Sequence, residues 1–227
     1  MRILTIDTTT NLGSVALVED NVLVGQFDLN LPLTHNQRLI NTLKALLDFA
    51  NITLDTIDLF AVVKGPGSFT GVRIGVATAK GLAYALNKPL IGINGLDAIA
   101  HNFPYTSYLI CPIIDARKRQ IFTAFYEAKD GQIKRISDYQ SITPESLLKG
   151  LRRKTIFAGT GVDVYQEIIK EKMKDRCLFP PAQLQRIHPQ TIARLAQEAL
   201  AQGENADPIA VVPFYIRPSD AELNRKV

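Results

Sequence analysis

The fold of this chain is decided by a short apolar run that ends in a carboxylate and occurs twice. It stands first as Ile3-Leu4-Thr5-Ile6-Asp7 and returns as Leu109-Ile110-Cys111-Pro112-Ile113-Ile114-Asp115, so the two aspartates lie 108 positions apart. Both runs predict buried strands, and two further strands joined by a short turn follow each of them. These further strands are expected at Ser14–Val18, Val22–Phe27, Ile121–Tyr126 and Gln132–Ser137. Each half of the chain therefore begins with three strands.

Helices and strands alternate through the rest of each half. Thr34-His35-Asn36-Gln37 has the form of a capping box, and apolar residues at helical spacing predict a helix that ends near Asn51. The other expected elements of the first half are a strand at Ile57–Val63, a helix at Ser68–Leu86, a strand at Leu90–Ile93 and a short helix that begins near Leu96. Those of the second half are a helix from Thr143 to Leu151, a strand at Thr155–Ala158, a helix at Val162–Met173 and a last helix that Gly203 ends. The order βββαβαβα thus occurs twice.

A duplicated βββαβαβα unit is the layout of the actin, Hsp70 and sugar-kinase superfold (ASKHA, ribonuclease H-like), in which two α/β lobes close over ATP. We therefore expect an N-terminal lobe at residues 1–104, a C-terminal lobe at residues 105–218 and a mobile tail at residues 219–227. This division places the last helix in the C-terminal lobe.

Composition excludes several classes of protein. Of the 227 residues, 46% are hydrophobic and 21% are charged, which is typical of a globular protein with a substantial core. No apolar run reaches the roughly 18–20 residues of a bilayer crossing, and Asp7 precedes any signal-peptide core, so we expect a cytoplasmic protein. Neither the two cysteines, Cys111 and Cys177, nor the three histidines have the spacing of a metal site, so no metal is expected.

The net charge of +4 is carried by the second half of the chain. Residues 1–100 hold 7 Lys and Arg against 8 Asp and Glu, whereas residues 101–227 hold 19 against 14. The excess is concentrated in Arg117-Lys118-Arg119, in Arg152-Arg153-Lys154 and in residues 170–176. Such runs either meet phosphate groups or form a solvated rim.

The turns after the two aspartates differ from phosphate-binding turns. In the superfold, a glycine turn follows the aspartate of each lobe because the phosphates of the nucleotide approach the backbone closely. Here Thr8-Thr9-Thr10 follows Asp7, and Ala116-Arg117 follows Asp115. Side chains therefore occupy the space that a phosphate needs. The two aspartates are either strand-end caps that bond turn amides or groups that hold a metal or a water.

The loop Gly65-Pro66-Gly67-Ser68-Phe69-Thr70-Gly71 joins a strand to a helix N-terminus, where free amides favour anions. It lacks the lysine of a Walker loop, so it is either a weak phosphate site or a tight turn that Ser68 caps. In the helix that follows, Gly71, Gly75 and Ala79 recur every four residues and make one face nearly flat. Glycine costs about 1 kcal/mol within a helix, so another backbone is expected close by. It belongs either to the lobe's own sheet or to another subunit.

Several of these motifs together resemble the TsaB family, also called YeaZ. The resemblance covers nearly the whole chain, and the stretch GPGSFTGVRIG is highly specific. The residues that carry it are Asp7-Thr8-Thr9-Thr10, Ser14-Val15-Ala16-Leu17, the run from Lys64 to Gly75, Lys80-Gly81-Leu82, Asp115-Ala116-Arg117 and Pro213-Phe214-Tyr215-Ile216-Arg217.

The resemblance implies a non-catalytic subunit, without a cofactor, of the bacterial machinery that makes N6-threonylcarbamoyladenosine at position 37 of tRNAs reading codons that begin with A. The implied partners are the catalytic paralogue TsaD, the ATPase TsaE and tRNA within the complex, with threonylcarbamoyl-adenylate as donor. Alone, the chain would be a monomer or a homodimer. The paralogue carries a histidine pair for its metal, whereas only His35 lies near the corresponding helix here, which favours loss of catalysis.

The resemblance also assigns site residues. Pairing in the family uses the first two helices of the N-terminal lobe, here Thr34–Asn51 and Ser68–Leu86, and the flat glycine face fits that role. The expected partner-binding residues are His35, Arg38, Leu39, Thr42, Thr70, Gly71, Val72, Gly75, Ala79 and Leu82. Arg117, Lys118 and Arg119 become candidate tRNA contacts.

Two other functions remain as alternatives. A small-molecule kinase or other ATPase of the same superfold would need tight ATP binding by the isolated chain. A protease or glycoprotease would need a metal pair or a Ser/His/Asp arrangement, and neither is recognisable in the sequence. The scaffold subunit is preferred because it explains the altered phosphate turns, the missing histidines and the flat helix together.

Overall fold

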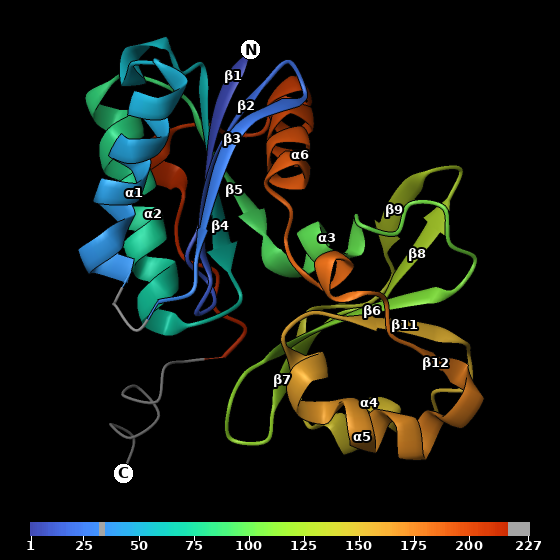
Figure 1. The fold of residues 1–227 in the computed structure, drawn as a ribbon. Helices are drawn as coiled ribbons and strands as arrows, with labels where there is room; N and C mark the ends of the chain where they lie inside the picture. The colour runs from blue at the N-terminus through green and yellow to red at the C-terminus, as the bar shows by residue number, and fades with distance from the viewer. Residues whose placement is uncertain (32–34, 218–227) are drawn as a thin grey trace. The chain divides into compact units, whose positions relative to one another are not determined.

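The computed structural model describes residues 1–31 and 35–217, which divide into two compact units. The first unit comprises Met1–Gly95 and His188–Phe214, and the second comprises Leu96–Ile187 and the segment that starts at Tyr215. Each unit is built on its own β-sheet with helices against it, so the duplicated α/β layout expected from the sequence is confirmed (Figure 1). No helix in the described ranges is both long and apolar enough to cross a membrane.

The sheet of the first unit has the strand order β3-β2-β1-β4-β5. Its strands are β1 (Arg2–Asp7), β2 (Gly13–Glu19), β3 (Val22–Leu29), β4 (Leu59–Gly65) and β5 (Leu90–Asn94), with a 3₁₀ turn, η1 (Leu54–Thr56), before β4. The first three strands are antiparallel, whereas β4 and β5 continue the sheet in parallel with β1. β1 and β4 are buried along almost their whole length because both faces of the sheet are covered.

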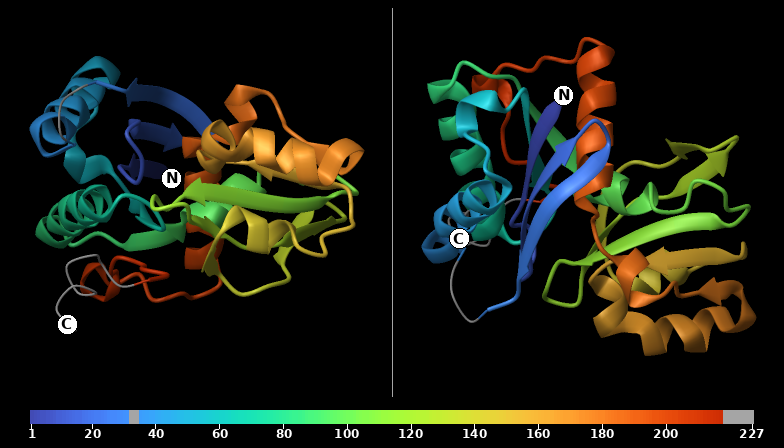
Figure 2. Two further views of the ribbon diagram at one scale, coloured as in Figure 1. Left: turned by 90° about the horizontal axis from the view of Figure 1, so that it is seen from below. Right: turned by 45° about the horizontal axis from the view of Figure 1, so that its top comes forward.

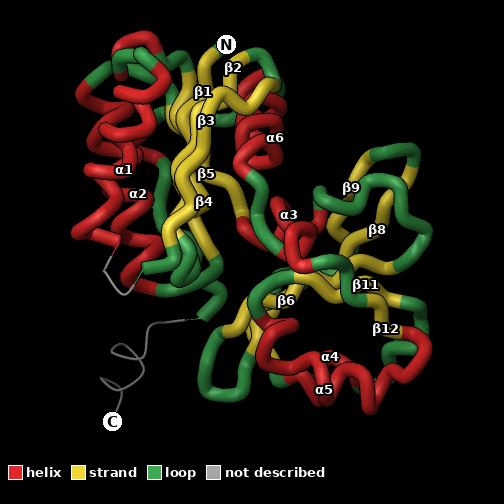
Figure 3. Tube along the Cα trace, in the orientation of Figure 1, coloured by secondary structure: helices red, strands yellow, loops and turns green. Residues whose placement is uncertain are grey.

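Helices cover both faces of this first sheet. α1 (His35–Ala50) and α2 (Phe69–Ala85) lie on one face and α6 (Pro189–Ala201) lies on the other, and the different views agree on this arrangement (Figures 1 and 2; helices are red in Figure 3). α1 buries a leucine stripe at positions 39, 43, 46 and 47, as its helical spacing predicts. The expected cap at Thr34 lies outside the described residues.

The expected lobe boundaries are corrected by the position of α6. This helix was expected in the C-terminal lobe, but it packs on β1, β2, β4 and β5 of the first unit. Its buried stripe of Ile192, Ala193, Ala196 and Ala199 covers an apolar sheet face that would otherwise meet water. The first unit is therefore made of two separate segments, and its first segment ends at Gly95 rather than at residue 104. The expected tail at 219–227 lies outside the described residues.

The sheet of the second unit has the order β10-β7-β6-β11-β12, with the hairpin β8-β9 attached to β6. Its strands are β6 (Leu109–Asp115), β7 (Ile121–Thr123), β8 (Tyr126–Lys129), β9 (Gln132–Arg135), β10 (Gln140–Ile142), β11 (Thr155–Ala158) and β12 (Cys177–Leu178). The other elements are α3 (Gly95–Ala100), α4 (Pro144–Leu148), α5 (Gly161–Met173), η2 (Lys174–Arg176), η3 (Ala182–Gln185) and, back in the first unit, η4 (Pro208–Ala210).

The second strand of this unit is broken, although one strand was expected at Ile121–Tyr126. The break falls at Phe125, whose amide donates to Ser137 Oγ (2.8 Å) and whose carbonyl accepts the amide of Ile136 (2.8 Å). These bonds replace ladder bonds at that point, so β7 and β8 take different partners: β7 pairs with β6 and β10, and β8 pairs with β6 and β9.

Candidate functional site

The turn after β1 closes around the carboxylate of Asp7. The amide and the hydroxyl of Thr9 both donate to Asp7 Oδ1, at 2.9 and 2.7 Å. Asp7 is 7% exposed, and burial raises the pKa of its carboxyl while the two bonds from Thr9 act in the opposite direction. Asp7 therefore caps the strand end by bonding a turn amide. No group of three or more His, Cys, Asp or Glu that could hold a metal gathers among the residues described.

Thr8 and Thr9 pack directly against the start of α2. The Ser68 amide donates to the carbonyl of Thr9 (2.7 Å), and the Thr8 hydroxyl donates to the carbonyl of Gly71 (2.6 Å). A Cβ at Gly67 or Gly71 would lie closer than 3.0 Å to the carbonyl oxygen of Thr9 or Thr8, so glycine is required where these backbones meet. Ser68 Oγ accepts the Gly71 amide (3.3 Å) and caps the helix. The glycine loop thus forms a tight capped junction.

The small residues of α2 face the unit's own sheet. A Cβ at Gly75 would come closer than 3.0 Å to Thr8 Oγ1, and Ala79 is fully buried in the core. The expectation that Gly71, Gly75 and Ala79 contact another subunit is therefore wrong, because these positions are filled from within the unit. The same correction applies to Leu39 and Val72, which are 4% and 1% exposed in the hydrophobic core.

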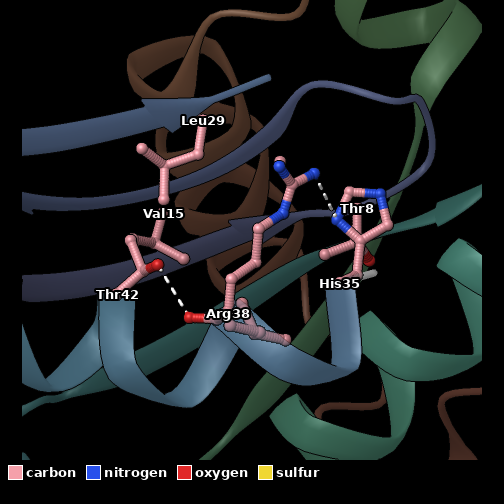
Figure 4. A pocket seen from close by; sticks show the side chains of 8 residues that line it. Thr8, Val15, Leu29, His35, Arg38 and Thr42 are labelled. Carbon is pink, nitrogen blue, oxygen red and sulfur yellow. Dashed lines mark hydrogen bonds between the residues drawn. The ribbon is translucent and has the colours of Figure 1, made fainter. Parts of the chain in front are cut away.

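Arg38 is also inside the unit, although it was expected to contact a partner. It is 7% exposed, and its Nη2 donates to the carbonyl of Asn11 (2.7 Å) and its Nη1 to that of Leu31 (3.4 Å). The Arg38 carbonyl accepts the hydroxyl of Thr42 (2.8 Å; Figure 4). The hollow beside Arg38 is about 10 Å³, which holds at most one water. Arg38 therefore ties α1 to two loops and does not line a ligand site.

His35 joins α1 to the turn that follows β1. Its Nδ1 lies 3.1 Å from Arg38 Nη2, and because a guanidinium only donates, Nδ1 is the acceptor (Figure 4). The ring proton then lies on Nε2, which donates to the carbonyl of Thr10 (2.7 Å). Burial lowers the pKa of His35 and the Arg38 charge lowers it further, while the bond to Thr10 opposes both. His35 is therefore a neutral structural link.

The outward face of α1 and α2 remains accessible. Of the ten expected partner-binding residues, Thr70 is exposed, and His35, Thr42 and Leu82 are half-buried. Two residues that were not among those expected are also accessible on these helices: Ile40, which is 55% exposed, and Arg73, whose guanidinium stacks on the Phe69 ring at 3.8 Å. No signal in the sequence marks Ile40 as exposed, because it lies three residues before Leu43 and seven before Leu47 and so fits the apolar spacing of α1.

The turn after β6 repeats the aspartate cap but stays open. The amide of Arg117 donates to Asp115 Oδ1 (3.0 Å), and the Tyr165 hydroxyl donates to the same oxygen (3.4 Å). Asp115 is therefore a strand-end cap, as Asp7 is. Arg117, Lys118 and Arg119 all have exposed side chains and belong to the second unit, whereas the expected partner-binding residues belong to the first.

Comparison with known proteins gives one consistent result. The family model of the tRNA N6-adenosine threonylcarbamoyltransferase TsaD matches residues 33–225. The tRNA threonylcarbamoyladenosine biosynthesis protein TsaB of Bacillus subtilis is 30% identical over 225 residues, covering 98% of this chain and 96% of that protein. TsaB of Escherichia coli is 30% identical over 226 residues, covering 96% and 95%. The structure of YeaZ from Pseudomonas aeruginosa superposes with a TM-score of 0.78 at 28% identity, covering 94% of this chain and 99% of that one.

Proposed function

Because the chain belongs to the TsaB family and carries a TsaD-family domain over residues 33–225, we propose that it is a scaffold subunit for tRNA modification. The product is N6-threonylcarbamoyladenosine at position 37 of tRNAs that read codons beginning with A. A TsaD-type paralogue transfers the group, a TsaE-type ATPase joins the pair, and tRNA binds to the assembled complex in the cytoplasm. The chain itself has no catalytic centre and needs no cofactor.

The junction between Thr8-Thr9 and α2 is the observation that supports a non-catalytic role. A phosphate bound at the start of this helix would need free amides and open space beside them. The Ser68 and Gly71 amides are already bonded, to Thr9 and to Ser68 Oγ, and Thr8 and Thr9 lie against Gly71 and Gly67. This end of the first sheet therefore suits rigid support better than nucleotide chemistry.

The pairing surface in this proposal is the outward face of α1 and α2. We define it by five exposed residues in the first halves of the two helices: Asn36, Ile40, Thr70, Arg73 and Ala77. The inner side of both helices packs against the sheet, so a partner has access to the outer side alone. An exposed isoleucine among polar groups is typical of the centre of a small protein interface. The same face would hold a second copy of the chain in a homodimer.

Reconstitution tests the proposed function directly. The chain is mixed with TsaD-type and TsaE-type subunits, threonylcarbamoyl-adenylate and an unmodified tRNA transcript, and each protein is omitted in turn. We expect modified tRNA in the complete mixture and a large loss of product when this chain is left out. Full product formation without the chain would contradict the proposal. Micromolar ATP affinity of the isolated chain with magnesium, measured by calorimetry, would favour the kinase alternative instead.

The pairing surface has its own test. Ile40→Glu places a charge at the centre of the surface and should abolish co-elution with the TsaD-type subunit in size-exclusion chromatography. Ile209→Glu is the matched control, since Ile209 is 61% exposed and lies in η4, outside the surface. Both variants should keep the wild-type melting temperature. Equal co-elution of the two variants would contradict the assignment of the face.

A further inference from the structure

The loop Ala116–Gln120, which joins β6 to β7, holds three successive residues in the left-handed region of the backbone. Arg117, Lys118 and Arg119 have φ angles of 58°, 50° and 59°. This region is unfavourable for any residue with a Cβ, and non-glycine residues usually visit it singly. All three side chains are exposed.

The two hairpin turns β2–β3 and β8–β9 use residues that suit this conformation. The turn between β2 and β3 has Asp20 and Asn21 in the left-handed region, and the turn between β8 and β9 has Asp130 and Gly131 there. Asp, Asn and Gly tolerate a positive φ better than other residues do. The loop after β6 has a long basic side chain at each such position instead. Residues that contradict the local backbone preference mark functional sites, so the turn alone does not account for Arg-Lys-Arg.

Hydrogen bonds hold the loop in this conformation. The Ala116 amide donates to the Gln120 carbonyl (2.9 Å), and the Gln120 amide donates to the Arg117 carbonyl (3.0 Å). Arg217, from a distant part of the sequence, donates to Gln120 Oε1 (2.7 Å) and to the Ala116 carbonyl (3.3 Å). The loop is therefore organised before any ligand arrives, which lowers the entropic cost of binding.

Two cations of the loop, Arg117 and Arg119, form no ion pair with a described carboxylate. Within residues 1–31 and 35–217, neither Arg117 nor Arg119 pairs with a carboxylate, and the Asp115 carboxylate is bonded to the Arg117 amide and the Tyr165 hydroxyl. The described carboxylates of this unit that form ion pairs bind other cations, at Arg135–Asp138, Arg153–Glu127, Lys170–Glu167 and Lys172–Glu171. Exposed cations in a fixed arrangement create a local positive potential that attracts a polyanion.

We propose that the loop 116–120 binds the phosphate backbone of the tRNA. This inference rests on the proposed function, which supplies tRNA as the polyanion that the assembled complex holds. The guanidinium groups of Arg117 and Arg119 are exposed and unpaired among the described residues, so both are available to phosphate oxygens. Phosphate contacts position an RNA without reading its sequence, which suits a subunit that serves several tRNAs.

An acidic protein surface is the competing occupant of the loop. Protein interfaces are centred on apolar and aromatic side chains, with charged groups at their rim. The loop offers no such centre, because Ala116 is buried and the three residues after it are all basic. The chemistry of the loop therefore favours RNA phosphate.

The test measures tRNA binding by the assembled complex of this full chain with TsaD-type and TsaE-type subunits. Arg117→Gln/Arg119→Gln removes two cations from the loop, and Arg152→Gln/Lys154→Gln, the matched control, removes two exposed cations from the same unit elsewhere. Kd for an unmodified transcript with adenosine at position 37 is measured at several KCl concentrations. Each lost phosphate contact lowers the slope of log K against log salt by roughly 0.7–0.9, so the loop variant should lower it by roughly 1.4–1.8 and weaken binding about tenfold at low salt. The control should match the wild type.

A second variant tests whether the left-handed backbone of the loop is retained for tRNA binding at the expense of stability. Arg119→Gly removes one cation and one unfavourable left-handed side chain, so it should raise Tm by about 1–4 °C while it lowers the salt slope by roughly 0.7–0.9. A higher Tm together with weaker tRNA binding would support the idea that the unfavourable backbone is retained for the ligand.

The outcomes separate this inference from the proposed function. If the wild-type complex modifies tRNA but the loop variant keeps the wild-type slope, the role of the loop is overturned and the scaffold function is not. If the loop variant loses association with the TsaD-type subunit instead of tRNA affinity, the loop is a protein contact. If the wild-type complex neither binds nor modifies tRNA, both proposals are overturned.

Discussion

The turns after β1 and β6 are the same structural element in two different environments. Each begins with an aspartate whose Oδ1 accepts the amide two residues later, from Thr9 in the first unit and from Arg117 in the second. In the first unit, α2 packs on the turn itself. In the second unit, Gly159 and Gly161 at the start of the equivalent helix α5 lie against the carbonyl of Ile113, and Tyr165 of α5 bonds Asp115, but the side chains of residues 117–119 are exposed. The first turn is closed by its helix and the second is left open.

The comparison teaches that the point where the helix meets the strand decides what the turn can do. A turn covered by a helix becomes part of the core, and its polar groups form hydrogen bonds within the unit. A turn that the helix contacts only at its first residue keeps its later side chains in water, where charge can be presented to a ligand. One duplicated element therefore yields a structural junction in one unit and a candidate binding loop in the other.

The largest effect is expected from a bulky residue in the closed junction. Gly75→Leu should lower the free energy of unfolding by about 1–3 kcal/mol or more, because the added side chain overlaps Thr8. Gly81→Leu is the matched control on the same helix, since nothing lies within 4 Å of its Cβ position, and it should stay near wild type. Urea unfolding measures both. Equal midpoints for the two variants would mean that α2 does not close on the turn.

A smaller difference is expected between the two aspartates. Asp7→Ala removes the acceptor of two buried hydrogen bonds and should cost about 1–3 kcal/mol, whereas Asp115→Ala in the open turn should cost under about 1 kcal/mol. Thermal unfolding of the two variants side by side gives the difference. A cost for Asp115→Ala as large as that for Asp7→Ala would remove the distinction between closed and open turns.

His35 should make the free energy of unfolding depend on pH, with an effect smaller than that of Asp7→Ala. Because burial lowers the pKa of His35, the unfolded chain binds a proton more readily than the folded one. The stabilising contribution is therefore complete above the unfolded pKa of about 6.5 and is lost as pH falls from there toward the lowered folded value. Unfolding in urea at pH 7.5 and 5.5 should show a smaller loss for His35→Gln than for wild type. The same loss in both proteins would show that His35 does not sense pH.

The smallest effect on stability is expected in the open turn. Arg117→Gln/Arg119→Gln changes exposed side chains that no described carboxylate holds, so the free energy of unfolding should stay within about 0.5 kcal/mol of wild type. Differential scanning calorimetry of the isolated chain checks this value. A loss above 1 kcal/mol would mean that these arginines hold the turn together.

The parts of the site that could be predicted from the sequence depend on neighbours within a few residues. An Asp at the end of an apolar run commonly bonds an amide two residues on, which favours strand-end caps at Asp7 and Asp115. Ser68 was interpreted as a possible helix cap for the same reason. The structure shows these hydrogen bonds at all three residues.

The parts that could not be predicted depend on residues far apart in the sequence or on unusual backbone. The spacing of Gly71 and Gly75 shows that something approaches α2, but the neighbour is Thr8, 63 residues before Gly71. The apolar stripe of α6 predicts a helix without indicating which sheet it covers. The left-handed backbone at 117–119 gave no signal, because Arg and Lys do not favour that conformation.

The two-segment construction of the first unit sets an order of events during synthesis. Translation begins with β1 and delivers α1, α2 and β5, yet α6 follows only after residues 96–187 have been made. Throughout that interval the sheet face that α6 will cover is apolar and available to chaperones or to other nascent chains. The second unit, almost continuous in sequence, can assemble meanwhile on the ribosome. The half that is started first is therefore completed only after residues 96–187 of the other half have been made.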